Sequence, residues 1–158
     1  MAGLTRMSTS DEASDGTEAT WTYIQRVRQR IDLHAKASGS FGLFPHFLTN
    51  LSNNLLFVLA YDALEYALRS LRDDKIFSRS GKIKMLSPLM EASRTGGISW
   101  LDYLLVEEGK NKRNDLVHRF TRSKDAEQLP RAECWKYVDA IERELTHWGL
   151  IASRQDTH

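Results

Sequence analysis

Three side chains within six residues could together carry out chemistry on a phosphodiester. Arg113 has a permanently charged, planar guanidinium whose donors match the geometry of a phosphate. His118 has an imidazole that can take or give a proton near neutral pH. Asn114 adds an amide that can orient either group. In this scheme His118 moves the proton, Arg113 holds the charge on the phosphate oxygens, and no metal ion or other cofactor is needed.

The spacing of these residues favours a site built from two chains. On an α-helix, Arg113 and His118 lie roughly 140° apart and do not share a face, whereas Asn114 and His118 do. One copy of the helix therefore does not easily focus Arg113 and His118 on one atom. Two copies that meet at a two-fold axis could form a shared cleft, which predicts a homodimer. The alternative is an ordinary solvated helix with a histidine near its end.

The sequence around these residues is locally basic. The whole chain has a net charge of only +1, but residues 109–124 contain six basic residues and one acidic residue. A phosphate backbone needs such a patch, and we expect contacts to RNA from Lys112, Arg119 and Arg122. A solvated helix end explains the same charges without any RNA.

The segment Arg-Asn-Asp-Leu-Val-His, residues 113–118, resembles the signature of the HEPN domains. In that signature four to six residues separate an Arg from a His, and a polar residue usually follows the Arg. Arg113, Asn114 and His118 stand at the matching positions. The resemblance covers roughly residues 20–152, although its specific part is the hexapeptide. Some toxin members carry a tyrosine two residues after the His, whereas this chain has Phe120.

The resemblance implies an all-α, dimeric, metal-independent endoribonuclease that acts as a toxin or in antiphage defence. In that mechanism the RNA 2′-hydroxyl attacks the adjacent phosphate and leaves a cyclic phosphate end. An antitoxin or a defence-system partner would restrain such an enzyme in its own cell. A second hypothesis stays open, in which the chain is a non-catalytic helical module that dimerises and binds protein, nucleotide or RNA. Its motif would then only staple the dimer through pairs between Arg and acidic residues.

Composition is that of an ordinary globular domain. The chain has 158 residues, of which 41% are hydrophobic and 27% charged. Its single cysteine excludes a disulfide framework and a thiolate metal site, and fits a reducing cytoplasm. No signal peptide is visible. The longest apolar run, residues 55–61, is too short to span a bilayer, so no membrane association is expected.

The apolar pattern predicts an all-α, up-and-down bundle of about five helices. Residues 1–19 are small, polar and acidic, so we expect a disordered tail there and a second one at 154–158. The helical domain then occupies residues 20–153. Its first amphipathic helix is predicted over about 20–37.

Breaks and caps predict the next helices. A second helix should run from a cap at Thr49 or Asn50 to about Asp73, and a short third one over residues 83–93. A last helix should follow Pro130, and its apolar residues alternate in steps of four and three: Cys134, Val138, Ile141, Leu145 and Trp148.

The motif itself is predicted to lie in the first turn of its own helix. Ser99 can cap the preceding helix, whose inward residues would be Trp100, Leu101, Leu104 and Leu105. Gly109 is expected to break or cap that helix, and Asn111 to cap the next one. Arg113 would then lie near backbone donors that also favour phosphate.

Two acidic residues of the second helix could support the motif. The run 55–61 is apolar nearly all round, which predicts a helix central to the bundle. Asp62 and Glu65 follow it, and a buried carboxylate needs a partner. Arg113 or His118 could be that partner. The alternatives are pairing with an arginine further along the same helix, or simple exposure.

Overall fold

In the computed structural model, residues 9–37, 43–74, 85–122 and 128–152 are described, and they form helices and no strand. The helices are α1 (Thr9–Ala37), α2 (Leu43–Asp73), α3 (Leu86–Thr95), α4 (Tyr103–Arg122) and α5 (Arg131–His147). The predicted all-α bundle of about five helices is therefore confirmed. None of these described helices is long and apolar enough to cross a membrane.

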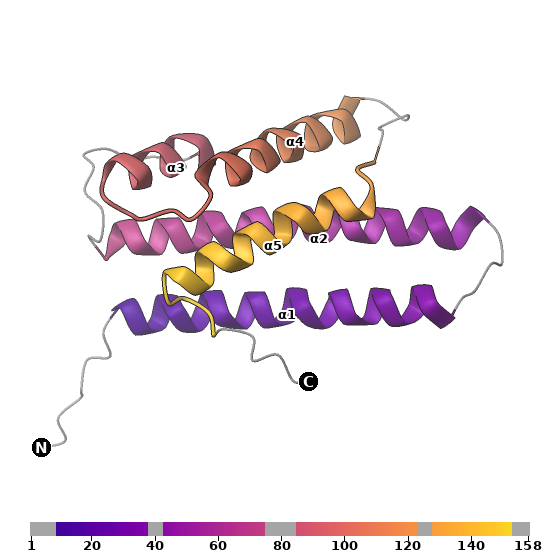
Figure 1. Cartoon of the computed structure of the whole chain (residues 1–158), viewed down its shortest axis with the longest axis horizontal. Coiled ribbons are helices and arrows are strands. Elements are labelled where there is room, and N and C mark those ends of the chain that lie inside the picture. Colours follow the sequence, from indigo (N-terminus) through magenta and orange to yellow (C-terminus); the bar gives the residue numbers. More distant parts are fainter. Residues whose placement is uncertain (1–8, 38–42, 75–84, 123–127, 153–158) are drawn as a thin grey trace, which may run out of the picture.

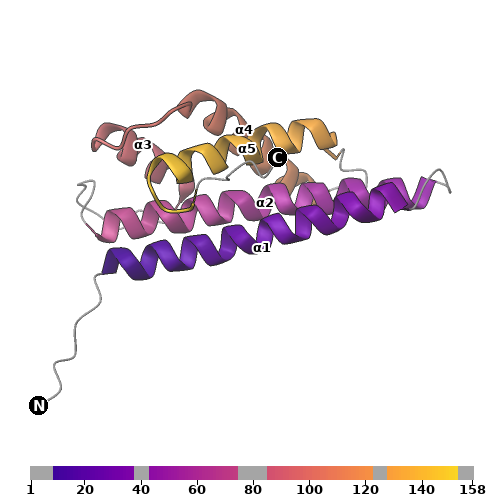
Figure 2. The same cartoon turned by 60° about the horizontal axis from the view of Figure 1, so that its bottom comes forward.

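The central helix is α2, which every other described helix contacts. α1 runs alongside α2 in the opposite direction, and α4 lies along another side of α2, also antiparallel to it (Figure 1). α5 crosses one face of α2 between α1 and α4, and α3 covers the C-terminal part of α2 (Figure 1, Figure 2). Among the described helices, none lies over the face of α2 opposite α5, where large side chains are exposed.

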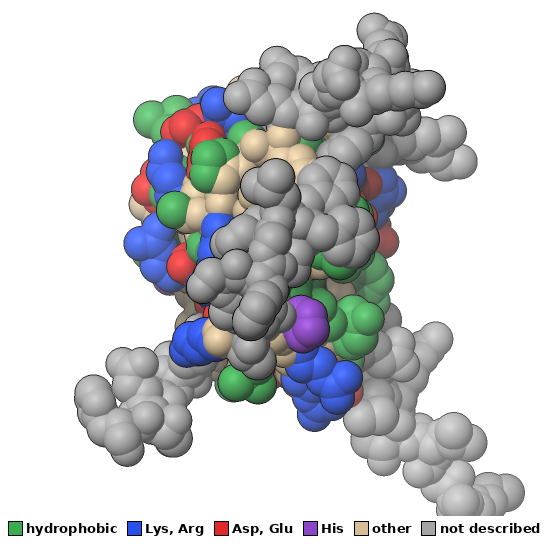
Figure 3. Space-filling view, turned by 90° about the vertical axis from the view of Figure 1, so that its right-hand side faces the viewer, with side chains coloured by type: hydrophobic (Ala, Val, Ile, Leu, Met, Phe, Trp, Pro, Cys, Tyr) green, Lys and Arg blue, Asp and Glu red, His purple; other side chains and the backbone are tan. Residues whose placement is uncertain are grey.

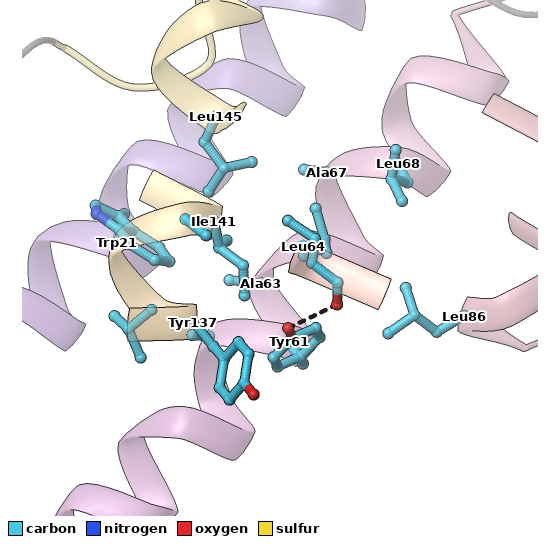
Figure 4. Packing of buried hydrophobic residues seen from close by; sticks show 14 of the residues in the cluster. Trp21, Tyr61, Ala63, Leu64, Ala67, Leu68, Leu86, Tyr137, Ile141 and Leu145 are labelled. Carbon is cyan, nitrogen blue, oxygen red and sulfur yellow. Dashed lines mark hydrogen bonds between the residues drawn. The ribbon is translucent and has the colours of Figure 1, made fainter. Parts of the chain in front are cut away.

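The hydrophobic core lies where α5 crosses α1 and α2. Figure 4 shows Ile141 and Leu145 of α5 between Trp21 of α1 and Leu64 of α2, and all four side chains are buried. The stripe predicted for the last helix is confirmed, because its first four members, Cys134 to Leu145, are buried and the fifth packs against this core. Because the stripe is used inside one chain, it is not available as a dimer surface.

α1 begins at Thr9, well before the predicted start near residue 20, so part of the predicted disordered tail is helical. Gly16 passes so close to α2 that a Cβ there would lie 2.8 Å from the Tyr66 hydroxyl. Small residues give no apolar pattern, yet they allow two helices to approach closely, which explains the difference. The first part of that tail and the predicted disordered C-terminus lie outside the described residues.

α2 also begins earlier than predicted, at Leu43 rather than after a cap at Thr49 or Asn50. Pro45 falls in its first turn, where the missing backbone N–H would have no partner within the helix in any case. The proline is therefore compatible with the longer helix.

The predicted central position of α2 is confirmed by its contacts with the other described helices, although one side of the helix is exposed. The inner side carries the buried residues Leu56, Phe57, Ala60, Tyr61, Leu64 and Leu68. The outer side carries four large apolar residues that are 42 to 55% exposed. We call this set the outer stripe; it consists of Leu48, Leu55, Leu59 and Tyr66. Asp62 lies within this stripe. The helix is apolar on every side there, but neighbouring helices cover only part of it.

α4 runs without a break through Gly109, so the predicted break there and the cap at Asn111 are wrong. Gly109 serves close packing instead. A Cβ at this position would lie 2.6 Å from the Tyr137 ring and closer still to the Tyr61 hydroxyl. Arg113 consequently lies in the middle of a long helix and not beside the unpaired N–H groups of a first turn.

The start of α4 is held by a residue of α5 and not by Ser99. Glu144 is buried, and its two carboxylate oxygens accept the backbone N–H groups of Leu101 at 2.9 Å and Asp102 at 2.6 Å. The Asp102 side chain then caps the first turn. Of the four residues expected to face inward here, Trp100 and Leu105 pack against the core, whereas Leu101 and Leu104 are exposed.

Candidate functional site

Arg113 of α4 is anchored to α2. Its Nη2 donates to Asp62 Oδ1 at 2.8 Å, and its Nη1 donates to Asn114 Oδ1 at 3.3 Å. The Arg113 side chain is 23% exposed, and its buried Nε finds no hydrogen-bond partner among the described residues. Each terminal nitrogen carries two N–H groups, so Arg113 keeps donors that could bind an oxyanion.

Of the two acidic residues predicted to support the motif, the structure brings only Asp62 to Arg113. Glu65 pairs instead with Arg69, one turn further along α2, which was the same-helix alternative. The difference follows from geometry, since Asp62 and Glu65 lie roughly 60° apart around the helix. Only Asp62 is turned toward α4.

Asn114 and His118 lie on the side of α4 that faces away from α5. Lys112 marks the α5 side, because its Nζ lies 3.5 Å from Glu133 Oε1 of that helix. Arg113 marks the α2 side. Successive residues of an α-helix are rotated by about 100° around its axis. Measured around the axis of α4 from Arg113, Lys112 lies about 100° in one direction. Asn114 and His118 lie about 100° and 140° in the opposite direction. His118 is exposed, so solvent or a ligand can reach its imidazole.

Only one of the three predicted RNA-binding cations can be placed. The Lys112 side chain is 45% exposed, and its contact with α5 turns it away from the side of His118. The side chains of Arg119 and Arg122 lie outside the described residues, although both positions belong to the last turns of α4. The described part of the basic patch is therefore divided between two sides of the helix.

Two buried tyrosines that were not predicted from the sequence fix α4 one to two turns before the motif. Tyr61 of α2 donates to the Val106 carbonyl at 2.8 Å, and Tyr137 of α5 donates to Glu108 Oε1 at 2.6 Å. Burial raises the pKa of both phenols, and the hydrogen bond from Tyr137 lowers the pKa of the Glu108 carboxyl. No sequence signal marks these contacts, because they join three helices that only folding brings together.

A cavity of about 380 Å³ lies near the motif, but on the other side of α4. Its lining comes from the α4–α5 corner: Lys112, Asp115, Leu116, Gln128, Leu129, Pro130 and Glu133. Since Asn114 and His118 face away from α5, this cavity does not form one site with them.

No metal centre is evident in the described part of the chain, where no three or more His, Cys, Asp or Glu side chains are grouped to hold an ion. Comparison with protein-family models, curated proteins and solved structures gives no match. A function for this chain is therefore inferred from the site itself.

The arrangement supplies two of the groups that phosphodiester cleavage needs. An arginine with remaining donors can hold a phosphate, and an exposed imidazole can move a proton. Arg113 and His118 point to different sides of α4, however, so one chain does not bring both to the same phosphorus atom.

Proposed function

We propose that the chain is a metal-independent endoribonuclease of HEPN type, active as a homodimer and serving as a toxin or antiphage-defence effector. Arg113 holds the phosphate of the RNA. His118 transfers the proton, and Asn114 orients the Arg113 guanidinium or the substrate. Asp62 positions Arg113, and a partner protein restrains the enzyme.

The reaction is an internal transesterification. The 2′-oxygen forms a bond to the adjacent phosphorus, and the bond from phosphorus to the 5′-oxygen breaks. The 2′-hydroxyl proton passes to an imidazole, while the departing 5′-oxygen takes up a proton, so the step uses a base and an acid. A dimer supplies two copies of His118 for these roles. The products are a 2′,3′-cyclic phosphate and a free 5′-hydroxyl.

One observation supports this proposal most directly. The Asp62 carboxylate holds Arg113 at 2.8 Å beside Asn114, and Asn114 shares a side of α4 with the exposed His118. A guanidinium fixed by a carboxylate is preorganised, which lowers the cost of binding a phosphate in a defined geometry.

The test compares three purified proteins: wild type, His118→Ala and His147→Ala. His147 is exposed like His118 and lies near the C-terminal end of a helix, but that helix is α5, so it is the matched control. Each protein is incubated with total RNA and a labelled tRNA pool in EDTA, and the cut ends are analysed for cyclic phosphate. We expect cleavage by wild type and His147→Ala only. Equal cleavage by His118→Ala would disprove the assignment of this residue.

The ion pair between Asp62 and Arg113 also favours a second candidate function. Here the guanidinium is bound to a carboxylate of its own chain, so it can act as a staple between α4 and α2, and such a structural role fits a non-catalytic module that binds protein, nucleotide or RNA. The salt dependence of binding separates RNA from protein ligands. Affinity for RNA falls steeply as the salt concentration rises, whereas binding through an apolar surface does not.

A further inference from the structure

The outer stripe of α2 is an apolar surface that the described helices leave open. It spans about 27 Å along the helix, close to the width of a standard interface that buries about 800 Å² per partner. Gly16 of α1 lies against Tyr66 and the two helices are antiparallel, so Tyr23 falls at the level of Leu59. Tyr23 is 62% exposed and widens the surface onto α1. Figure 3 views the bundle from the end where α2 begins, and there hydrophobic side chains reach the surface in several places between charged ones.

The stripe is complementary to itself when two copies of α2 run antiparallel. Its members are symmetric about position 57, because Leu48 and Tyr66 each lie nine residues away and Leu55 and Leu59 each lie two residues away. A two-fold axis at this level would set Leu48 against Tyr66 of the second copy and Leu55 against Leu59. Such a reciprocal match is what an interface between identical chains requires.

Charges on this surface also fit a second copy. Asp62 is already paired with Arg113 of its own chain. The antiparallel register sets Asp62 opposite Ser52, whereas parallel helices would set the two Asp62 carboxylates against each other. Like charges placed across an interface oppose association, so the antiparallel register is preferred.

The same axis would bring the two motifs together. α2 and α4 are antiparallel, and the contact between Asp62 and Arg113 sets their register. His118, five residues beyond Arg113, therefore lies at the level of position 57, where the symmetry axis passes. An axis that lies in the interface and runs across α2 keeps both α4 helices on the same side. Asn114 and His118 also face away from α5, as the stripe does.

We infer that the outer stripe is the homodimer interface and that the two His118 side chains flank its two-fold axis. The inference deepens the proposed function and rests on it only for the catalytic use of the shared cleft. It explains why four large apolar side chains are exposed next to the motif. It also explains how one arginine and one histidine on different sides of a helix come to serve one phosphate.

The first test measures mass in solution by light scattering and sedimentation equilibrium, without RNA. We expect a dimer for wild type and a monomer for Leu59→Glu. The substitution should reduce the affinity of the two chains for each other roughly 100-fold or more, because each Leu59→Glu dimer would bury two unpaired carboxylates. The matched control is Leu104→Glu. Leu104 is also exposed, but it lies in the N-terminal half of α4, whereas the motif lies in the C-terminal half. Circular dichroism verifies that each variant is folded. A monomeric wild type, or a dimeric Leu59→Glu, would overturn the inference.

Cross-linking tests the register. Leu55→Cys and Leu59→Cys proteins, one of them tagged, are oxidised separately and as a mixture; the native Cys134 is buried and does not compete. We expect the disulfide between Cys at 55 and Cys at 59 to dominate in the mixture. Dominant pairing of each variant with itself would overturn the antiparallel register.

Failure of this inference can be told apart from failure of the proposed function. A wild-type dimer that depends on the stripe but does not cleave RNA argues against the nuclease and leaves the interface standing. A monomeric wild type that cleaves RNA through His118 refutes the interface and the dimeric state, and leaves only the ribonuclease activity of His118 standing.

Discussion

Replacing Gly109 by alanine sets two opposing effects against each other. In an open helix interior, the change stabilises the folded state by about 1 kcal/mol, because glycine is the poorer helix former. In this bundle the added methyl group would lie 2.6 Å from the Tyr137 ring and closer still to the Tyr61 hydroxyl. Both neighbours are buried rings on two different helices, so neither can swing away freely.

The cost should exceed the gain. Overpacking a filled core costs about 1–3 kcal/mol, and sometimes more. Moving Tyr61 would also weaken its hydrogen bond to the Val106 carbonyl, which is worth about 1 kcal/mol. With the helix-propensity gain subtracted, we expect Gly109→Ala to lower the free energy of unfolding by about 2 kcal/mol.

Urea denaturation followed by circular dichroism at 222 nm measures this change. The matched control is Gly16→Ala in α1, where the nearest atom is the hydroxyl end of the half-exposed Tyr66 side chain at 2.8 Å. That side chain can move outward, so the control should be neutral or up to about 1 kcal/mol more stable. A Gly109→Ala protein as stable as wild type would refute the close packing of α4 against α2 and α5.

Three further changes test other parts of the structure. Glu144→Gln removes a buried carboxylate that accepts two backbone N–H groups at the start of α4, and should cost about 1–3 kcal/mol in urea denaturation; no change would refute the cap. Asp62→Asn weakens a pair whose carboxylate is half exposed, and should cost less than about 1 kcal/mol; a larger loss would show that Arg113 depends on it for folding. Burial, with Glu107 and Glu91 nearby, raises the pKa of Tyr103 to about 12. The folded pKa is thus above the ordinary value of 10.0, so the stability that the neutral phenol contributes is complete below pH 10 and is lost as pH rises through 12. Tyr103→Phe should remove this part of the alkaline loss, as followed by denaturation and by phenolate absorbance.

The sequence by itself determined the fold class and the last helix. The steps of four and three from Cys134 to Leu145 allow one buried face only on a helix, and those residues are buried. The same local chemistry marked Arg113, Asn114 and His118 and gave their angular positions on one helix. Local periodicity is sufficient for such predictions because it depends on neighbouring residues alone.

Tertiary structure decided which sides of the helices are covered. Apolar composition could not distinguish buried Phe57 from exposed Leu55 and Leu59, because the helix is apolar all round at that point. From the sequence, Gly109 predicts a break in the helix. The structure shows instead that Tyr61 and Tyr137 pack so closely against Gly109 that they leave no room for a side chain there.

The identity of the acid beside Arg113 also depended on the fold. Asp62 and Glu65 are equivalent by residue type and nearly so by position, but Asp62 is turned toward α4 and Glu65 is paired with Arg69 of its own helix. Contacts between residues far apart in sequence depend on how the helices pack, and helix packing results from all the side chains of the core together. Local sequence patterns therefore identified the chemical groups, and only the tertiary structure decided which of them meet.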